Sequence, residues 1–431
     1  MTRIALPAGS QRGAVAVLVA LALAVLIGFA GLSLDLGRLY VNKTELQNAA
    51  DACALAASRE LTCPAAPCPA SGLTNAQAAG IMVGGRNSRD LQSQSVTIAP
   101  EDVKFSTVLA PNSTYRSIAG GADTASKYVM CIARSNGIVP WFMGVLGIGA
   151  KDVNATAVAT LAAAQTNCGI PLALCSKGPA SGTPPYGLVI GNWYGGRFGS
   201  GGGASGNFNW VDFTPPAGGE PELANMLTGN GICNMNVTNP VGQTGVLGNA
   251  GAKAFNSRFG LYQNGGGNPQ IDNAPPDYTG YAYTSAAVVS GPNYTWPSGS
   301  NALSDFLSKR NSHAPYGTSV AAGNAATGLS LANSYNNANS PAQPSALATK
   351  GADRRLVVSP IVDCAGWGGG STTTPILAWA CVLMLHPISS PTDNVYFEYR
   401  GLSSAPGSPC ATSGAVGGPG SVGPQVPALV Q

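Results

Sequence analysis

An uncharged apolar segment near the N-terminus, residues 13–34, constrains this chain more than any other feature of its sequence. As a helix rising about 1.5 Å per residue, this segment is long enough to cross the roughly 30 Å hydrocarbon core of a bilayer. Arg3 and Arg12 precede it without any acidic residue, which predicts a cytoplasmic N-terminus and an exported remainder. The alternative is a cleaved secretory signal peptide, whose apolar region is shorter, at roughly 7 to 15 residues. Either alternative exports the chain.

The composition predicts short strands and many turns beyond this segment. Charged residues make up 10% of the 431 residues, against roughly 25% in ordinary globular domains. Glycine (57) and proline (32) are abundant, and both favour turns and loops over long helices. The net charge of +3 comes without any run of basic residues, so we expect no nucleic-acid partner.

The N-terminal helix is expected to continue past the membrane, because residues 35–61 contain no proline and are rich in alanine. Large or sulfur-containing side chains recur every seven residues in this stretch, with two alanines on the same face. These candidate partner-binding residues are Leu39, Leu46, Ala50, Cys53 and Ala57. Two alternatives follow: the face packs on the protein's own domain, or it forms a stem that bundles with neighbouring subunits.

The N-terminal residues resemble a known family. The opening RGAV, the apolar run and LDLGRLYVNKTELQNAADACALAASREL together resemble the TadE/TadG-like Flp pilus-assembly proteins of the Tad system, over roughly residues 11–61. The resemblance implies a single-pass protein of the bacterial inner membrane whose bulk is periplasmic. It also implies two kinds of partner, the lipid of that membrane and other Tad pilus-assembly proteins or pilin subunits. Pilins cut by the pilin-type peptidase carry a glutamate five residues after the cleaved glycine. In this chain the fifth residue after Gly13 is Leu18, so we expect the protein to stay anchored.

The remaining pattern predicts an α+β protein, with a small antiparallel, pilin-like sheet beside the stem and a mainly β, loop-rich C-terminal domain. Alternating or apolar runs predict strands at 95–98, 103–109, 127–134 and 152–161, a short apolar helix over 137–150, and paired strands at 376–388 and 395–402. A short helix is expected near Ala302–Lys309. The predicted divisions are a cytoplasmic segment 1–12, a membrane helix 13–34, a stem with a small domain 35–164, a mainly β domain 165–405 and a flexible tail 406–431.

Ten cysteines in an exported chain predict disulfides. No CxxC pair occurs, and the candidate cysteines are two closely spaced pairs that could close short loops, Cys63 with Cys68 and Cys168 with Cys175. Free buried thiols are the alternative. The spacing leaves the connectivity open.

The sequence contains no GxSxG elbow, HExxH helix or Walker loop, so we expect no enzyme activity, no cofactor and no metal site. His386 lies in an apolar run and is expected in the core. A glycine-rich segment, residues 191–213, carries the aromatic residues Trp193, Tyr194, Phe208 and Trp210. These rings either pack in the core or bind glycan on the surface. The function favoured by the sequence is a membrane-anchored assembly component acting through protein contacts, and the alternative is a surface adhesin or glycan-binding protein.

Overall fold

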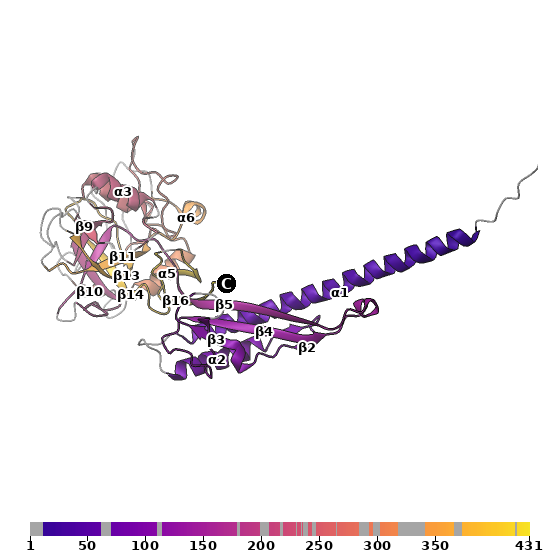
Figure 1. The fold of residues 1–431 in the computed structure, drawn as a ribbon. Helices are drawn as coiled ribbons and strands as arrows, with labels where there is room; N and C mark the ends of the chain where they lie inside the picture. Colours follow the sequence, from indigo (N-terminus) through magenta and orange to yellow (C-terminus); the bar gives the residue numbers. More distant parts are fainter. Residues whose placement is uncertain are drawn as a thin grey trace, which may run out of the picture. The chain divides into compact units, whose positions relative to one another are not determined.

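The computed structural model divides into two compact units, residues 1–162 with 427–431, and residues 163–426 (Figure 1). The residues that the structure describes are 12–61, 70–109, 114–178, 182–198, 207–215, 219–229, 231–233, 235, 240–243, 247–263, 265–283, 293–295, 302–317, 341–365, 373–418 and 420–431.

The first unit is built on one long helix, α1 (Arg12–Arg59). Side chains from Val15 to Ala30 are all exposed, while the C-terminal half of the helix is covered on one face. Leu46, Ala50 and Ala57 lie on that covered face and are fully buried. The apolar run and the alanine-rich continuation therefore form one helix, as the sequence predicts, with two different environments along it (Figure 1).

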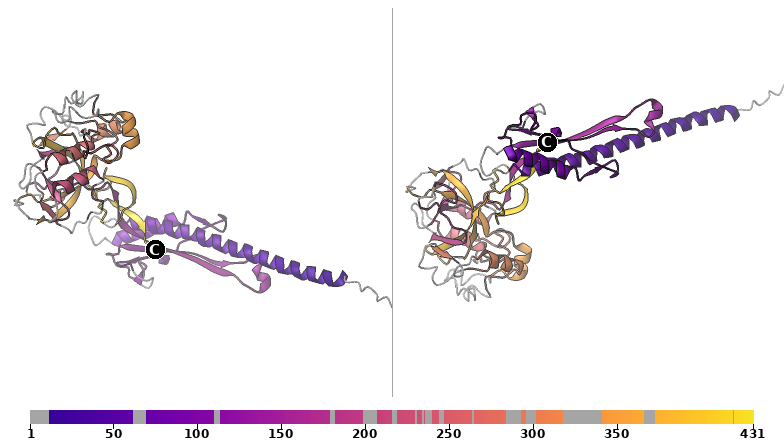
Figure 2. Two further views of the ribbon diagram at one scale, coloured as in Figure 1. Left: turned by 90° about the horizontal axis from the view of Figure 1, so that it is seen from above. Right: turned by 90° about the horizontal axis from the view of Figure 1, so that it is seen from below.

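A small antiparallel sheet and a second helix cover the buried half of α1. The elements are α2 (Ala70–Gly84), β1 (Ser88–Arg89), β2 (Gln94–Ser95), η1 (Pro100–Asp102), β3 (Val103–Ser106), β4 (Tyr128–Ile138), η3 (Met143–Leu146) and β5 (Lys151–Thr166). Strand β4 pairs with β3 and with β5, and the β4–β5 hairpin runs beside α1 in both views of Figure 2. The strands predicted at 103–109, 127–134 and 152–161 are confirmed by β3, β4 and β5. The strand predicted at 95–98 is wrong, because β2 ends at Ser95 and residues 96–98 form no strand. Residues 137–150 form the end of β4, a loop and one 3-10 turn instead of an apolar helix.

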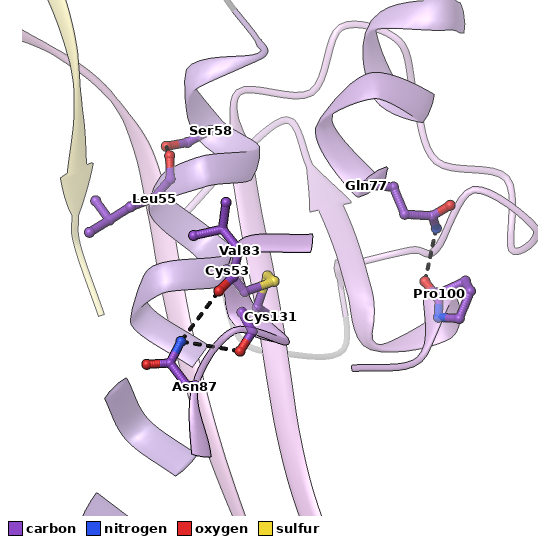
Figure 3. Close-up of a disulfide and its surroundings, with 9 residues drawn as sticks. Cys53, Leu55, Ser58, Gln77, Val83, Asn87, Pro100 and Cys131 are labelled. Atoms are coloured by element: carbon purple, nitrogen blue, oxygen red, sulfur yellow. Dashed lines mark hydrogen bonds between the residues drawn. A yellow bond between two sulfur atoms is a disulfide. The ribbon is translucent and has the colours of Figure 1, made fainter. Parts of the chain in front are cut away.

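Along the strands of the first unit, every second side chain points into the core. Val129, Cys131 and Ala133 of β4 face the alanines of α1, as the two-residue period of a strand requires. Small side chains let the elements approach closely: a Cβ at Gly84 of α2 would lie 2.9 Å from the Cβ of Cys53. The disulfide Cys53–Cys131 joins α1 to β4 at this point (Figure 3). The Asn87 amide caps α2 by donating to the carbonyls of Val83 and Gly84, as Figure 3 shows.

The second unit contains a nine-stranded sheet in the order β10-β7-β14-β13-β11-β6-β8-β9-β12. Its strands are β6 (Leu172–Cys175), β7 (Asn192–Arg197), β8 (Phe208–Asp212), β9 (Val241–Gln243), β10 (Asn293–Thr295), β11 (Leu356–Val362), β12 (Thr373–Thr374), β13 (Ile376–Met384) and β14 (Asn394–Leu402). Strands β6 and β11 are parallel, and the other pairs in the order are antiparallel. The predicted pairing of the two C-terminal apolar strands is confirmed by β13 and β14.

Both faces of the central strands are buried, which explains their continuous apolar sequence. Val357 and Val382 belong to the core on one face, and Val358 and Leu383 to the core on the other. The helices are α3 (Glu220–Thr228), α4 (Asn249–Ser257), α5 (Leu303–Asn311) and α6 (Pro344–Lys350). Residues of α3 and α4 join the first core, and Phe306 of α5 joins the second. The helix predicted near Ala302 is confirmed, and His386 is 5% exposed.

The C-terminal residues are ordered into strands where the sequence predicts a flexible tail. Strand β15 (Ala411–Val416) pairs with residues 164–166, and β16 (Gln425–Leu429) pairs with β5. In the first unit, the Val158 N–H donates to the Gln431 carbonyl at 2.8 Å. Glycine and proline in this stretch favour turns between short strands, and the backbone hydrogen bonds of a neighbouring strand hold these residues in place.

Candidate functional site

Four polar side chains of α1 follow the apolar run at intervals of three and four residues. We call them the polar ladder: Asp35, Arg38, Asn42 and Glu45. Residues at this spacing share one face of a helix. The ladder holds two loops of the first unit against α1 at the end of the apolar run, and each member uses its polar atoms in a different way.

Asp35 holds the loop between β4 and β5. Its carboxylate accepts the backbone N–H groups of Trp141, Phe142 and Met143 at 2.7, 2.8 and 2.6 Å. These N–H groups lie at the start of η3, where a helical turn leaves its donors without partners in the backbone. Asp35 is only 2% exposed, so the loop covers it.

Arg38 joins α1 to both loops at once. Its Nε and Nη2 donate to the two carboxylate oxygens of Asp90 at 2.7 Å each, and its Nη1 donates to the Val139 carbonyl at 3.0 Å. The guanidinium also lies 4.5 Å from the centre of the Trp141 ring. A two-pronged arginine–carboxylate pair is among the stronger charged contacts in proteins. The hydrogen bonds from Arg38 hold the pKa of Asp90 below its ordinary value, even though desolvation opposes this shift.

Glu45 and Asn42 secure the turn that contains Asp90. Asp90, Leu91 and Gln92 all adopt positive φ angles, of 54°, 58° and 65°. Three consecutive left-handed residues without glycine are costly and persist only where their surroundings hold them. Glu45 does so by accepting the backbone N–H groups of Leu91 and Gln92 at 3.2 Å each, while the Asn42 amide donates to Asp90 at 3.3 Å.

Gly31 lets the β4–β5 loop touch the apolar part of α1. A Cβ at this position would lie 2.6 Å from the Cβ of Phe142, which is closer than two side chains can approach. Gly31 is buried, although residues 15–30 of α1 are all exposed. The missing side chain at Gly31 therefore lets Phe142 pack directly on the helix, one turn before Asp35.

The face of α1 that repeats every seven residues, and that the sequence predicts to bind partners, packs mostly inside the protein. Leu46, Ala50, Cys53 and Ala57 are fully buried in the core of the first unit, and Leu39 is half-buried. The stem interpretation is therefore corrected for the four buried residues, because a side chain packed in its own domain has no surface left for a neighbouring subunit, while for Leu39 it stays a prediction. The other alternative, a helix packed on its own domain, describes the four buried residues.

The aromatic residues of the glycine-rich segment are also internal. Trp193, Tyr194, Phe208 and Trp210 are at most 2% exposed. The Trp193 indole donates to Glu398 at 2.9 Å, and Phe208 packs edge-on against Trp210. Glycan binding by these four rings is corrected in favour of core packing, since a buried ring offers no face to a sugar.

The described cysteines form four disulfides, none of which closes a short loop. Cys168 bonds to Cys233 and Cys175 bonds to Cys364, so these two cysteines are not partners of each other. The remaining pairs are Cys53–Cys131 and Cys381–Cys410. Cys63 and Cys68 lie outside the described residues. Cys168 and Cys175 are therefore disulfide cysteines, as the sequence predicts, but each bonds to a cysteine far along the chain instead of closing the short loop between them.

Replacing Asp35 by asparagine is expected to loosen the β4–β5 loop without unfolding the first unit. The amide keeps one acceptor oxygen but loses the charge and the second oxygen that serve the three N–H groups. Amide hydrogen exchange at Trp141–Met143 should accelerate about tenfold or more. Asp51→Asn is the matched control, since Asp51 accepts a side-chain hydrogen bond from Gln47 on the same helix and its pair does not hold a loop. Equal protection of the loop in both variants would contradict the role of Asp35.

The polar ladder was not among the residues singled out from the sequence. Its signal was present, because four polar residues at helical spacing directly after an apolar run form a stripe that a membrane helix does not need. Among the residues that the structure describes, no three His, Cys, Asp or Glu side chains gather to form a metal site.

Comparison with known proteins concerns this same segment. No curated protein and no solved structure matches the chain. Residues 13–66 match the model of the Tad family, described as "Putative Flp pilus-assembly TadE/G-like". This range contains the apolar run, the whole polar ladder and Cys53. The resemblance predicted from the sequence is thus confirmed: the N-terminal segment of the chain is similar to the TadE/G-like Flp pilus-assembly family.

Proposed function

We propose that this protein is a membrane-anchored structural component of a Tad (Flp) pilus system, acting outside the cytoplasm through contacts with other proteins. The observation that carries the proposal is the family match over residues 13–66, which suggests a role in pilus assembly. The matched family is one of assembly proteins rather than enzymes. The proposed partners are other Tad assembly proteins or pilin subunits.

Three features of the molecule support the proposed location in the bacterial inner membrane. Within the described residues, α1 is the one helix long and apolar enough to cross a membrane, and only 6% of its most apolar window is buried. Exposed leucines and valines along such a helix favour lipid as its surroundings. Four disulfides favour an oxidising compartment for both units. Arg3 and Arg12 favour a cytoplasmic N-terminus, and with that orientation the two units would lie in the periplasm.

The surface proposed for partner contact is the exposed side of α1 beyond the apolar run. Leu36 and Tyr40 are 54% and 75% exposed and lie four residues apart on one face. Because most of the face that repeats every seven residues is buried, Leu36 and Tyr40 are the large apolar side chains that α1 exposes next to the proposed membrane segment. Tyrosine with an exposed neighbouring leucine is typical of a contact site for a protein.

We expect Tyr40→Asp to reduce recovery of the protein's pilus-machinery partners by about tenfold or more, as for an interface residue worth at least about 1.4 kcal/mol. The measurement is co-purification of the full chain, with a surface tag, from the cells that make it, together with a count of surface pili. Val189→Asp in the second unit is the matched control, because Val189 is also an exposed apolar residue, at 56%. Unchanged piliation and partner recovery in Tyr40→Asp, with normal protein levels, would refute this contact surface.

The adhesin alternative predicts binding through the aromatic residues of the glycine-rich segment. Their burial removes the surface on which that hypothesis depends. No other described feature favours it, and we propose one function only.

A further inference from the structure

Residues 139–148, within the loop between β4 and β5, present apolar side chains to solvent at an unusual density. We call this segment the tip loop. Val139, Trp141, Phe142 and Val145 are 67%, 56%, 44% and 90% exposed. The chain carries no charge between Arg134 and Lys151. Clustered exposed apolar groups of this kind mark a contact with a partner or with lipid.

The position of the tip loop along α1 indicates that its contact is lipid rather than a partner protein. Asp35 and Gly31 bind the loop to the helix at the C-terminal end of the uncharged run 13–34. Phe142 packs at Gly31, three residues before the run ends. At about 1.5 Å per residue, this places the Phe142 ring on the order of 5 Å inside the boundary of the apolar run. A side chain at that depth beside a membrane helix lies within the lipid.

The chemistry of the loop fits the boundary between headgroups and acyl chains. Tryptophan concentrates at this level of membranes because its ring is apolar and its N–H is polar. The Arg38 guanidinium lies 4.5 Å from the centre of the Trp141 ring, so a positive charge lies at the same level as the tryptophan. The backbone N–H groups of Trp141, Phe142 and Met143 are already satisfied by Asp35, so the first turn of η3 enters the apolar layer without unpaired donors.

We propose that the tip loop inserts into the membrane interface beside α1 and forms a second lipid contact. The proposal rests on the anchoring of α1 in the membrane. One helix alone leaves the first unit free to rotate about the helix axis and to shift in depth. A second contact on one side of α1 fixes both, so that Tyr40 and the rest of the exposed helix face are presented to partners in one orientation. Asp35 then has a clear role as the residue that sets the depth of the loop.

Quenching of tryptophan fluorescence by lipid tests the insertion. The intact chain is reconstituted in vesicles of phosphatidylcholine and phosphatidylglycerol whose acyl chains carry bromine either close to the headgroups or close to the bilayer centre. The chain has six tryptophans, so the wild type is compared with Trp141→Phe, which keeps an apolar ring. We expect bromine near the headgroups to quench wild-type fluorescence, and most of that quenching to be lost in Trp141→Phe. Bromine at the bilayer centre should quench Trp141 less.

A second pair of variants tests the loop without removing the probe. Val145→Asp places a charge on the most exposed apolar side chain of the tip loop and should reduce the quenching of Trp141. Val189→Asp in the second unit should leave it unchanged. Flotation of the vesicles on a density gradient tests the anchoring of α1 in the membrane separately from the insertion of the tip loop. Protein that fails to float overturns the anchoring and the insertion together, whereas protein that floats with equal quenching in wild type and Trp141→Phe overturns the insertion alone and assigns the tip loop to a protein partner.

Discussion

Replacing Cys175 and Cys364 together by serine is expected to lower the free energy of unfolding of the second unit by about 5 kcal/mol. These cysteines are 189 residues apart in the chain, and their bond joins the ends of β6 and β11. A crosslink over so long a loop removes more freedom from the unfolded chain than one over a short loop. Parallel strands such as β6 and β11 also lack a tight turn that would hold them together.

The measurement is urea denaturation of the full chain followed by tryptophan fluorescence. Trp193, Trp210 and Trp379 are buried in the second unit, so their signal reports its unfolding. The matched control replaces Cys381 and Cys410, which are 29 residues apart, and for which the same model expects a smaller loss of about 3.5 kcal/mol. A larger loss from the Cys381–Cys410 variant than from the Cys175–Cys364 variant would contradict loop length as the source of the stabilisation.

Asp277→Ala is expected to destabilise the second unit by about 3–5 kcal/mol, because it removes the carboxylate from a buried group of arginines. Asp277 is fully buried and accepts the backbone N–H groups of Arg354 and Arg355 at 2.9 Å each. Arg355 is fully buried too, and its guanidinium donates to main-chain carbonyls, including that of Met384. Burial lowers the pKa of Arg355 to about 10, and the charge of Asp277 opposes this shift. Without Asp277, two buried N–H groups lose their acceptor and the arginine charges lose their counter-ion.

Asp272→Ala is the control for this prediction. Asp272 is paired with Lys350 at 2.9 Å, but its side chain is 76% exposed, so we expect a change within about 0.5 kcal/mol. Both variants are compared by the same denaturation experiment, and Asp277→Asn adds a variant that keeps one acceptor oxygen. Loss of stability in Asp277→Ala no larger than in Asp272→Ala would show that the buried cluster is satisfied without its carboxylate.

The elements that sequence reasoning predicted are those whose signal is local. Helix α1 follows from an uninterrupted run without proline, and α5 from a short helical pattern. Strands β13 and β14 follow from two neighbouring apolar runs that pair across a short connection. The turn-rich tail was mispredicted, because β15 and β16 are held by hydrogen bonds to distant strands, which leave no trace in their own residues.

In the candidate site, too, the sequence predicted what depends on neighbouring residues and missed what depends on distant ones. The sequence identified the resemblance to TadE/G-like proteins, since the apolar run and the residues after it carry the match. It did not show that Asp35, Arg38 and Glu45 bind two loops, because their partners lie about 50 to 100 residues further along the chain.

By itself, the sequence determined a long helix with an apolar half, a cysteine-rich remainder, and the pairing of the last apolar strands. Each of these follows from residues close together in the chain, through side-chain hydrophobicity and backbone propensity. Only the tertiary structure decided which face of α1 is buried, which cysteines are bonded, and which aromatic rings are internal. Such choices depend on which surfaces meet when distant segments pack, and a helix face or a cysteine carries no record of its partner until the chain has folded around it.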